Sequence, residues 1–141
     1  MIFEAAVLDT STVLAWLGIG GVASAEHLDV ARASVTTSTI DEIAQFLALR
    51  YEGNPPAALA QTLALEWAPM TVYPPLPLLA ETMRYYGELA NWSLAAAIAL
   101  AQAQHLPLIT VHAAAHAVEV PGLTVIRWWL LDQGEQQTPE T

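Results

Sequence analysis

The 141-residue chain predicts a single α/β sandwich domain built on a mainly parallel central sheet. Short apolar runs with strand character alternate with helical segments along the whole length, and this order is typical of parallel sheets covered by helices. An apolar content of 55% is enough to bury a full core, and the length is that of one domain. We expect residues 1–131 to form this domain and residues 132–141, rich in Gly, Gln, Thr and Pro, to be a disordered acidic tail.

Local signals place the elements in the first half of the chain. Thr10 and Ser11 offer hydroxyl caps for a helix that follows the first apolar run, and a glycine-rich segment ends it. Ser38 opens a later helix with Asp41 and Glu42 in its first turn, where acids favour the positive end of the helix dipole. The expected elements are strands at 3–8, 33–36 and 70–73 and helices at 10–17, 24–31, 38–50 and 55–67.

The second half continues the alternation. A proline-rich connector at residues 74–77 precedes a helix, and Ser93 caps the most alanine-rich helix of the chain. The β-branched runs that follow it indicate buried strands, with a turn at residues 121–122 between them. The expected elements are helices at 78–88 and 94–104 and strands at 108–111 and 123–126.

Two aromatic pairs indicate further core positions. Neighbouring residues of a strand face opposite ways, so one of Trp128 and Trp129 is expected to pack inside and the other to lie at the surface or an interface. For Tyr85 and Tyr86 on a helix, we expect one ring to be half-buried and the other to point outward, with core packing or a dimer face favoured over stacking on bases.

The composition limits the chemistry of the chain. Fourteen acidic residues against four arginines give a net charge of -10, so any contact with RNA is expected to be local. The absence of cysteine excludes disulfides, thiolate metal sites and cysteine nucleophiles. The first twenty residues lack the basic residues of a secretory signal, and polar residues interrupt the longest uncharged stretch, 89–118. We therefore expect a cytoplasmic protein with no membrane partner.

Two acids and a histidine lie where α/β proteins bind ligands, close to the carboxyl ends of strands. Asp9 follows the first strand and His112 the fourth, while Glu42 lies at the start of a helix. Each also has a structural interpretation that the sequence leaves open. Asp9 can be a helix cap, Glu42 can serve the helix dipole, and His112 can be a neutral hydrogen-bonded side chain.

The order of elements and two acidic signatures resemble the PIN domain, particularly the VapC-type ribonuclease toxins, over residues 6 to about 128. Residues 7–15 (VLDTSTVLA) resemble the family's first strand and helix, whose aspartate is a metal ligand and is here Asp9. Residues 37–43 (TSTIDEI) resemble the second signature, in which a glutamate points into the same pocket. Glu42 takes that place.

Two further signatures are similar but lack their acids. Residues 92–97 (WSLAAA) resemble the third signature, with Ala96 where an aspartate is expected. Residues 107–112 (PLITVH) resemble the fourth, with His112 where an aspartate should end the strand. Ala114 also lies where many relatives keep an acid, so the departures fall on one side of the pocket.

The resemblance implies a PIN-like three-layer α/β/α sandwich and a metal-dependent endoribonuclease site. In that family, carboxylates hold magnesium or manganese, which activates a water for attack on a phosphodiester. Asp9 and Glu42 are the residues we expect to be catalytic and to bind metal weakly, and His112 is a further candidate ligand that suits manganese better than magnesium. The residues expected to line the pocket around them are Thr10, Ser11, Ala96 and Thr110.

With two of four acids absent, we expect a degenerate active site, weak or absent nuclease activity, and a binding or regulatory role. The alternative is a working Mg- or Mn-dependent endoribonuclease toxin whose altered site uses Asp9, Glu42 and either His112 or Asp41. A third alternative, a generic small-molecule binding domain, would take its ligand in a pocket away from Asp9. The resemblance further implies an antitoxin-like peptide as partner, and the apolar helices and surplus aromatics favour a homodimer.

Overall fold

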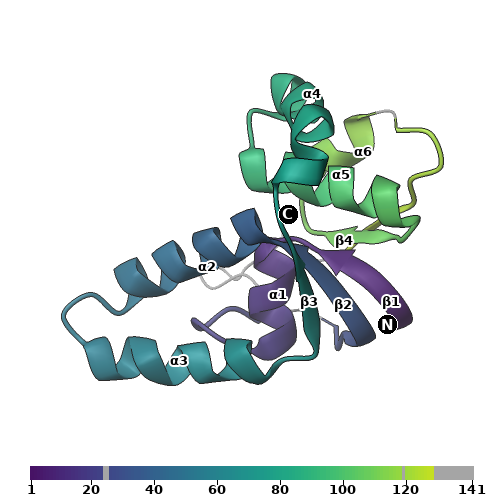
Figure 1. The fold of residues 1–141 in the computed structure, drawn as a ribbon. Helices are drawn as coiled ribbons and strands as arrows, with labels where there is room; N and C mark the ends of the chain where they lie inside the picture. The colour runs from purple at the N-terminus through teal and green to yellow at the C-terminus, as the bar shows by residue number, and fades with distance from the viewer. Residues whose placement is uncertain (24–25, 119, 129–141) are drawn as a thin grey trace, which may run out of the picture.

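The computed structural model describes residues 1–23, 26–118 and 120–128, and within these residues five parallel strands form one sheet in the order β3-β2-β1-β4-β5. Helices cover both faces of the sheet, so the predicted three-layer α/β/α sandwich is confirmed (Figure 1). The strands are β1 (Ile2–Leu8), β2 (Asp29–Thr36), β3 (Met70–Tyr73), β4 (Leu108–Thr110) and β5 (Val125–Arg127). The helices are α1 (Thr10–Leu17), α2 (Thr37–Arg50), α3 (Pro55–Trp67), the 3-10 turn η1 (Leu76–Leu78), α4 (Leu79–Leu89), α5 (Trp92–Gln104) and α6 (Ala114–Ala117).

Alternate residues of the strands feed two separate cores. Leu8 of β1 and Ile109 of β4 pack on the side of α1 and α2, whereas Val7 and Leu108 pack on the side of α5. This division follows from the two-residue period of a strand, which sends neighbouring side chains to opposite faces. Figure 1 shows α1, α2 and α3 on one side of the sheet and α4, α5 and α6 on the other.

Helix α5 is the central element of its layer. All nine residues from Ser93 to Ala101 are buried, and five of them are alanines, so the helix can lie close to the sheet. The buried hydroxyl of Tyr85 on α4 donates to Gln102 Oε1 of α5 at 2.6 Å and ties the two helices together. Tyr86 is 44% exposed, so the predicted division of this aromatic pair is confirmed.

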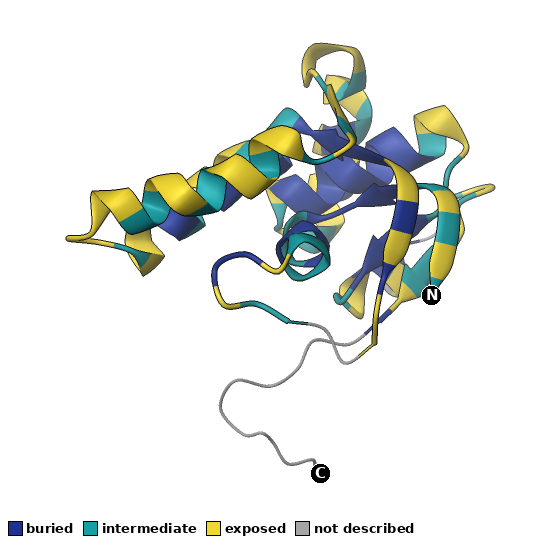
Figure 2. Ribbon diagram, turned by 90° about the horizontal axis from the view of Figure 1, so that it is seen from below, coloured by how far each residue is buried: buried dark blue, intermediate teal, exposed yellow. Residues whose placement is uncertain are grey.

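Helices α2 and α3 form an arm that extends beyond the sheet (Figure 1). Exposed and half-buried residues cover most of this arm, while the buried residues gather in the middle of the molecule (Figure 2). No residue of α3 is buried. Helix α3 therefore adds surface to the protein and little to its core, whereas α2 contributes the buried side chains of Ile43 and Leu47.

The predicted helix at residues 24–31 is wrong. Residues 24 and 25 lie outside the described part, and residues 29–36 form the single strand β2, which pairs with β1 from Ile2↔Asp29 to Val7↔Ser34. The Asp29 amide donates to the Met1 carbonyl at 2.8 Å at the start of this ladder. Pairing with β1 outweighs the weak local preference of the segment for a helix.

Two predicted helix starts are also corrected. Helix α2 begins one residue earlier than expected because Thr36 is its cap and accepts from the Thr39 amide at 3.2 Å. Asp41 and Glu42 therefore lie beyond the first turn, where the dipole has little effect. Helix α5 is capped by Asn91, whose side chain accepts from the Leu94 amide, and not by Ser93.

The end of the chain is only partly described. Strand β5 lies two residues later than predicted, and the Trp128 amide that follows it donates to the Thr110 carbonyl at 3.1 Å. Trp128 is 1% exposed, whereas Trp129 and the expected tail at 132–141 fall outside the described residues. The helices of the described part are too short or too polar to cross a membrane.

Candidate functional site

The strand order reverses between β1 and β4, which makes the gap beyond their carboxyl ends the expected ligand site of this sheet. Asp9 immediately follows β1, and Thr110 is the last residue of β4. Two of the residues predicted for the site thus meet at this switch point.

Asp9 is held on both of its carboxylate oxygens. Its Oδ1 accepts from the Thr12 amide at 3.1 Å, which makes Asp9, and not Thr10 or Ser11, the cap of α1. Its Oδ2 accepts from the Thr110 hydroxyl at 2.5 Å. The residue is only 2% exposed. Asp9 therefore joins the start of α1 to the end of β4 inside the protein.

The neighbours of Asp9 continue these hydrogen bonds across the end of the sheet. The Thr12 hydroxyl donates to the Ile109 carbonyl and accepts from Trp128 Nε1, both at 3.0 Å. The His112 amide donates to the Thr110 hydroxyl, also at 3.0 Å. We call Asp9, Thr12, Thr110 and Trp128 the switch-point network. Protein side chains thus occupy the gap beyond the carboxyl ends of β1 and β4, where a ligand would be expected.

Burial controls the protonation of Asp9. Desolvation raises the pKa of its carboxyl above the ordinary value of 3.8. Hydrogen bonds from Thr110 and Thr12, and the nearby His112, act in the opposite direction and do not outweigh the loss of water. The surroundings of Asp9 thus make its anion less favourable than that of an exposed aspartate.

Glu42 lies in a different cavity. Its Oε1 accepts from the Ser93 hydroxyl at 2.9 Å, and the side chain is exposed on the second turn of α2. The surrounding cavity, of about 290 Å³, is hereafter the acidic cavity. It is lined by Ser38, Asp41, Glu42, Gln45, Trp92 and Ser93. Asp9 does not belong to this lining and is only 2% exposed, whereas Glu42 is exposed.

The remaining predicted pocket residues are also divided. Thr10 and Ser11 are half-buried in the first turn of α1, and the Thr10 hydroxyl is a buried group without a hydrogen-bond partner in the described structure. Ala96 is 5% exposed within α5, and His112 is half-buried. Sequence reasoning missed Gln45 and Trp92. The spacing of Ser38, Asp41, Glu42 and Gln45 along one helix face was the signal that could have indicated this cavity.

A metal ion does not fit these residues as they are arranged. Magnesium keeps several waters of its octahedron, but the carboxyl of Asp9 is buried and hydrogen-bonded on both oxygens. Within residues 1–23, 26–118 and 120–128, His, Asp and Glu side chains form no cluster of three or more that could hold a metal. We therefore derive no catalytic step through a metal.

Comparisons with known proteins add no relative to this description. No family model matches the chain, and neither a curated protein nor a solved structure matches it. The resemblance to the PIN domain rests on the residues quoted above.

Asp9→Asn is expected to reverse a pH-dependent loss of stability. Because the folded state raises the pKa of Asp9, it binds the proton more tightly than the unfolded chain, and wild-type stability falls as the pH rises above 3.8 through the raised value. An uncharged Asn removes this loss. Its Oδ1 can still accept from the Thr12 amide, and its Nδ2 can donate to the Thr110 hydroxyl oxygen in place of the present bond. Urea unfolding should show the variant gaining stability relative to wild type between about pH 4 and pH 7.

Asp9→Ala provides the comparison. It removes the cap and leaves the Thr110 hydroxyl without its acceptor, so a loss of about 2 kcal/mol is expected across this pH range. A fall in the relative stability of Asp9→Asn with rising pH would contradict the prediction, because it would mean that the fold stabilises the Asp9 anion.

Proposed function

We propose that this chain is a PIN-like domain with a degenerate active site, which binds a partner and does not cleave RNA. The observation that carries the proposal is the position of Asp9 in the switch-point network. The carboxyl that the resemblance assigns to metal binding is buried, has a pKa raised by desolvation and caps α1. Glu42, the second acid, faces solvent from another cavity.

The alternative, a Mg- or Mn-dependent endoribonuclease, makes a definite structural demand. Asp9 would have to leave Thr12 and Thr110 and share an ion with Glu42 and either His112 or Asp41. Each lost hydrogen bond to the carboxylate costs about 1.5–3 kcal/mol, which metal binding would have to offset. The arrangement of the free protein thus favours binding over catalysis.

An apolar stripe supplies a surface for a partner. Leu79, Met83 and Tyr86 recur at helical spacing on α4 and are 38%, 59% and 44% exposed. The ring of Tyr86 meets that of Trp92 edge to face, with 5.6 Å between the ring centres. We call these four residues the α4 stripe. Exposed apolar side chains in such a row are typical of an interaction site.

Acidic residues lie next to one end of the α4 stripe. Trp92 also lines the acidic cavity, whose two acids, Asp41 and Glu42, are both exposed. Neither acid forms an ion pair with the described residues. An amphipathic helix with apolar residues on one face and arginine or lysine at one end would complement both surfaces. This is the chemistry expected of the antitoxin-like peptide.

We propose that the exposed face of α3 binds a second copy of the chain. Leu59, Leu63 and Trp67 lie four residues apart on one face of the helix and are 67%, 52% and 85% exposed. An apolar cavity of about 320 Å³ adjoins them and is lined in part by Leu65, Ala68, Met70 and Val72. In a twofold dimer, Trp67 of each copy could fill the cavity of the other.

Nuclease assays test the loss of catalysis. Purified protein is expected to leave single-stranded RNA intact in millimolar Mg²⁺ or Mn²⁺, because Asp9 is not available to an ion. Asp9→Asn and Glu42→Gln serve as controls for a contaminating nuclease. Metal-dependent cleavage that both substitutions abolish would establish the alternative.

Peptide binding tests the α4 stripe. A synthetic helical peptide with leucines on one face and arginines at one end should bind, as measured by calorimetry. The double variant Asp41→Asn/Glu42→Gln should weaken binding about tenfold and reduce its salt dependence, because it removes the charges that face the arginines. Glu52→Gln/Glu66→Gln changes the net charge equally and should bind as wild type does. Equal losses in the two double variants would reject the site.

Sedimentation tests the homodimer. Wild-type protein should sediment as a dimer at micromolar concentration, and Leu63→Glu should yield a monomer because it buries a charge in the apolar interface. Met83→Glu, a matched change on the α4 stripe, should leave the dimer intact and abolish peptide binding. A wild-type monomer would refute the proposed dimer.

A further inference from the structure

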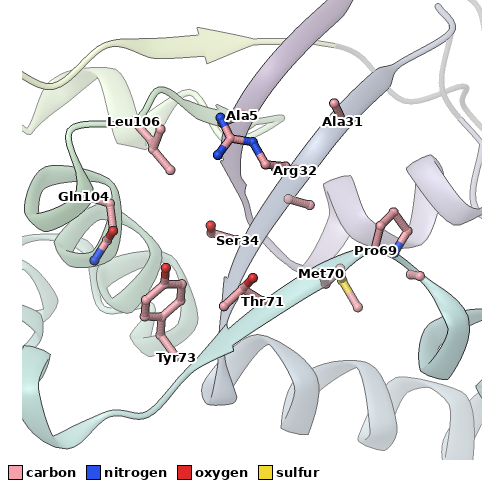
Figure 3. Close-up of a pocket in the computed structure, with 12 residues that line it drawn as sticks. Ala5, Ala31, Arg32, Ser34, Pro69, Met70, Thr71, Tyr73, Gln104 and Leu106 are labelled. Atoms are coloured by element: carbon pink, nitrogen blue, oxygen red, sulfur yellow. The ribbon is translucent and has the colours of Figure 1, made fainter.

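A third cavity lies away from both Asp9 and the acidic cavity. It has a volume of about 500 Å³ and opens between β2, β3 and the last turn of α5 (Figure 3). This volume lies within the usual range for small-molecule sites. We call it the sheet cavity. The polar residues of its lining are Arg32, Ser34, Thr71, Tyr73 and Gln104.

The sheet cavity is polar where a parallel sheet is normally apolar. Such sheets are buried on both faces and consist largely of apolar residues. On β2, Ala33 and Val35 meet this expectation on the side of α1 and α2. The opposite face carries Ser34, which pairs in register with Thr71 of β3. The cavity is therefore better suited to a polar ligand than to an apolar helix.

Its hydrogen-bonding groups are available. Figure 3 shows the polar ends of Ser34, Thr71 and Tyr73 directed into the hollow, with Gln104 across from them. In the described part of the chain, the side chains of these four residues make no hydrogen bond with the protein. Three hydroxyl groups and one amide can thus serve a ligand without breaking an existing contact.

The charges around the sheet cavity favour one orientation of a bound ligand. Arg32 is the one charged residue in the described lining, and its Nε lies 3.6 Å from Glu4 Oε2, with both side chains well exposed. An exposed ion pair of this kind contributes at most about 1 kcal/mol, so another oxyanion can replace Glu4. The carboxyl end of α5, next to Gln104, carries partial negative charge. An anionic group is therefore favoured at Arg32, and neutral groups are favoured near Gln104.

We propose that the sheet cavity binds a small hydroxylated oxyanion. The guanidinium of Arg32 would hold a carboxylate or phosphate, while Ser34, Thr71 and Tyr73 would hydrogen-bond the ligand's hydroxyl groups. This inference is independent of the proposed peptide binding, because the cavity shares no lining residue with the acidic cavity or the α4 stripe. Its lining shares Ala68 and Met70 with the apolar cavity proposed for the dimer.

Titration of the full chain with small probes, followed by amide NMR, tests the proposal. Glycerol phosphate or glycerate should shift the Ser34, Thr71 and Tyr73 amide signals in a saturable way, and comparison of the two distinguishes a phosphate from a carboxylate ligand. Glycerol, which lacks the oxyanion, should bind at least tenfold more weakly. Equal shifts with glycerol, or no saturable shift with either anion, would overturn the proposal.

Matched variants locate the charge. Arg32→Gln should weaken binding of the better anion at least tenfold, and Glu4→Gln should strengthen it because the competing carboxylate is gone. Arg84→Gln is the control, since Arg84 is also exposed and lies 3.6 Å from Glu81 outside this cavity. Unchanged binding by Arg32→Gln, or an equal loss in Arg84→Gln, would overturn the assignment.

Discussion

The buried carboxyl of Asp9 is the interaction on which the end of this sheet depends. Asp9 follows β1, caps α1 through the Thr12 amide and holds β4 through the Thr110 hydroxyl. One side chain thus connects β1, α1 and β4, which come from opposite halves of the chain. Trp128, at the end of the described chain, completes the same network. Its Nε1 donates to the Thr12 hydroxyl, and its backbone amide donates to the Thr110 carbonyl. Because unpaired polar groups in this position would each cost about 1–3 kcal/mol, the network constrains α1, β4 and the segment after β5 together.

The same network separates two roles that the PIN resemblance would combine in one pocket. A metal ligand must be charged and reachable by water, whereas a buried cap that joins strands is most stable when neutral and enclosed. Asp9 has the second environment, and Glu42 remains exposed beside Ser93 and Trp92. The polar surfaces that stay open are therefore the acidic cavity and the sheet cavity. Neither cavity has Asp9 or Thr110 in its lining.

The alternation of apolar runs with helical segments predicted the sheet, its parallel strands and most element bounds, because these depend on local pattern. The caps of α1, α2 and α5 were assigned to the wrong residue by one to two positions, because several neighbouring residues can cap a helix. The larger failures occurred where distant residues determine the structure. Residues 29–32 became part of β2 through pairing with β1, and the bond between Glu42 and Ser93 joins residues 51 positions apart. Asp9 was recognisable as a residue at a strand end. Its burial could not be predicted, because it depends on distant residues. Thr110 lies 101 positions from Asp9, and Trp128 lies 116 positions from Thr12.

The replacement of an expected aspartate by His112 bears directly on why Asp9 can be buried. Under the PIN assignment, a carboxylate at position 112 would add a second negative charge beside Asp9, and like charges in a dry site require a cation to hold them. His112 instead lowers the pKa of Asp9, which partly offsets desolvation without a metal. Its amide also orients the Thr110 hydroxyl towards the carboxyl. Without an acid at position 112, Asp9 has no like charge at that position, and the hydrogen bonds from Thr12 and Thr110 can hold its carboxyl in place.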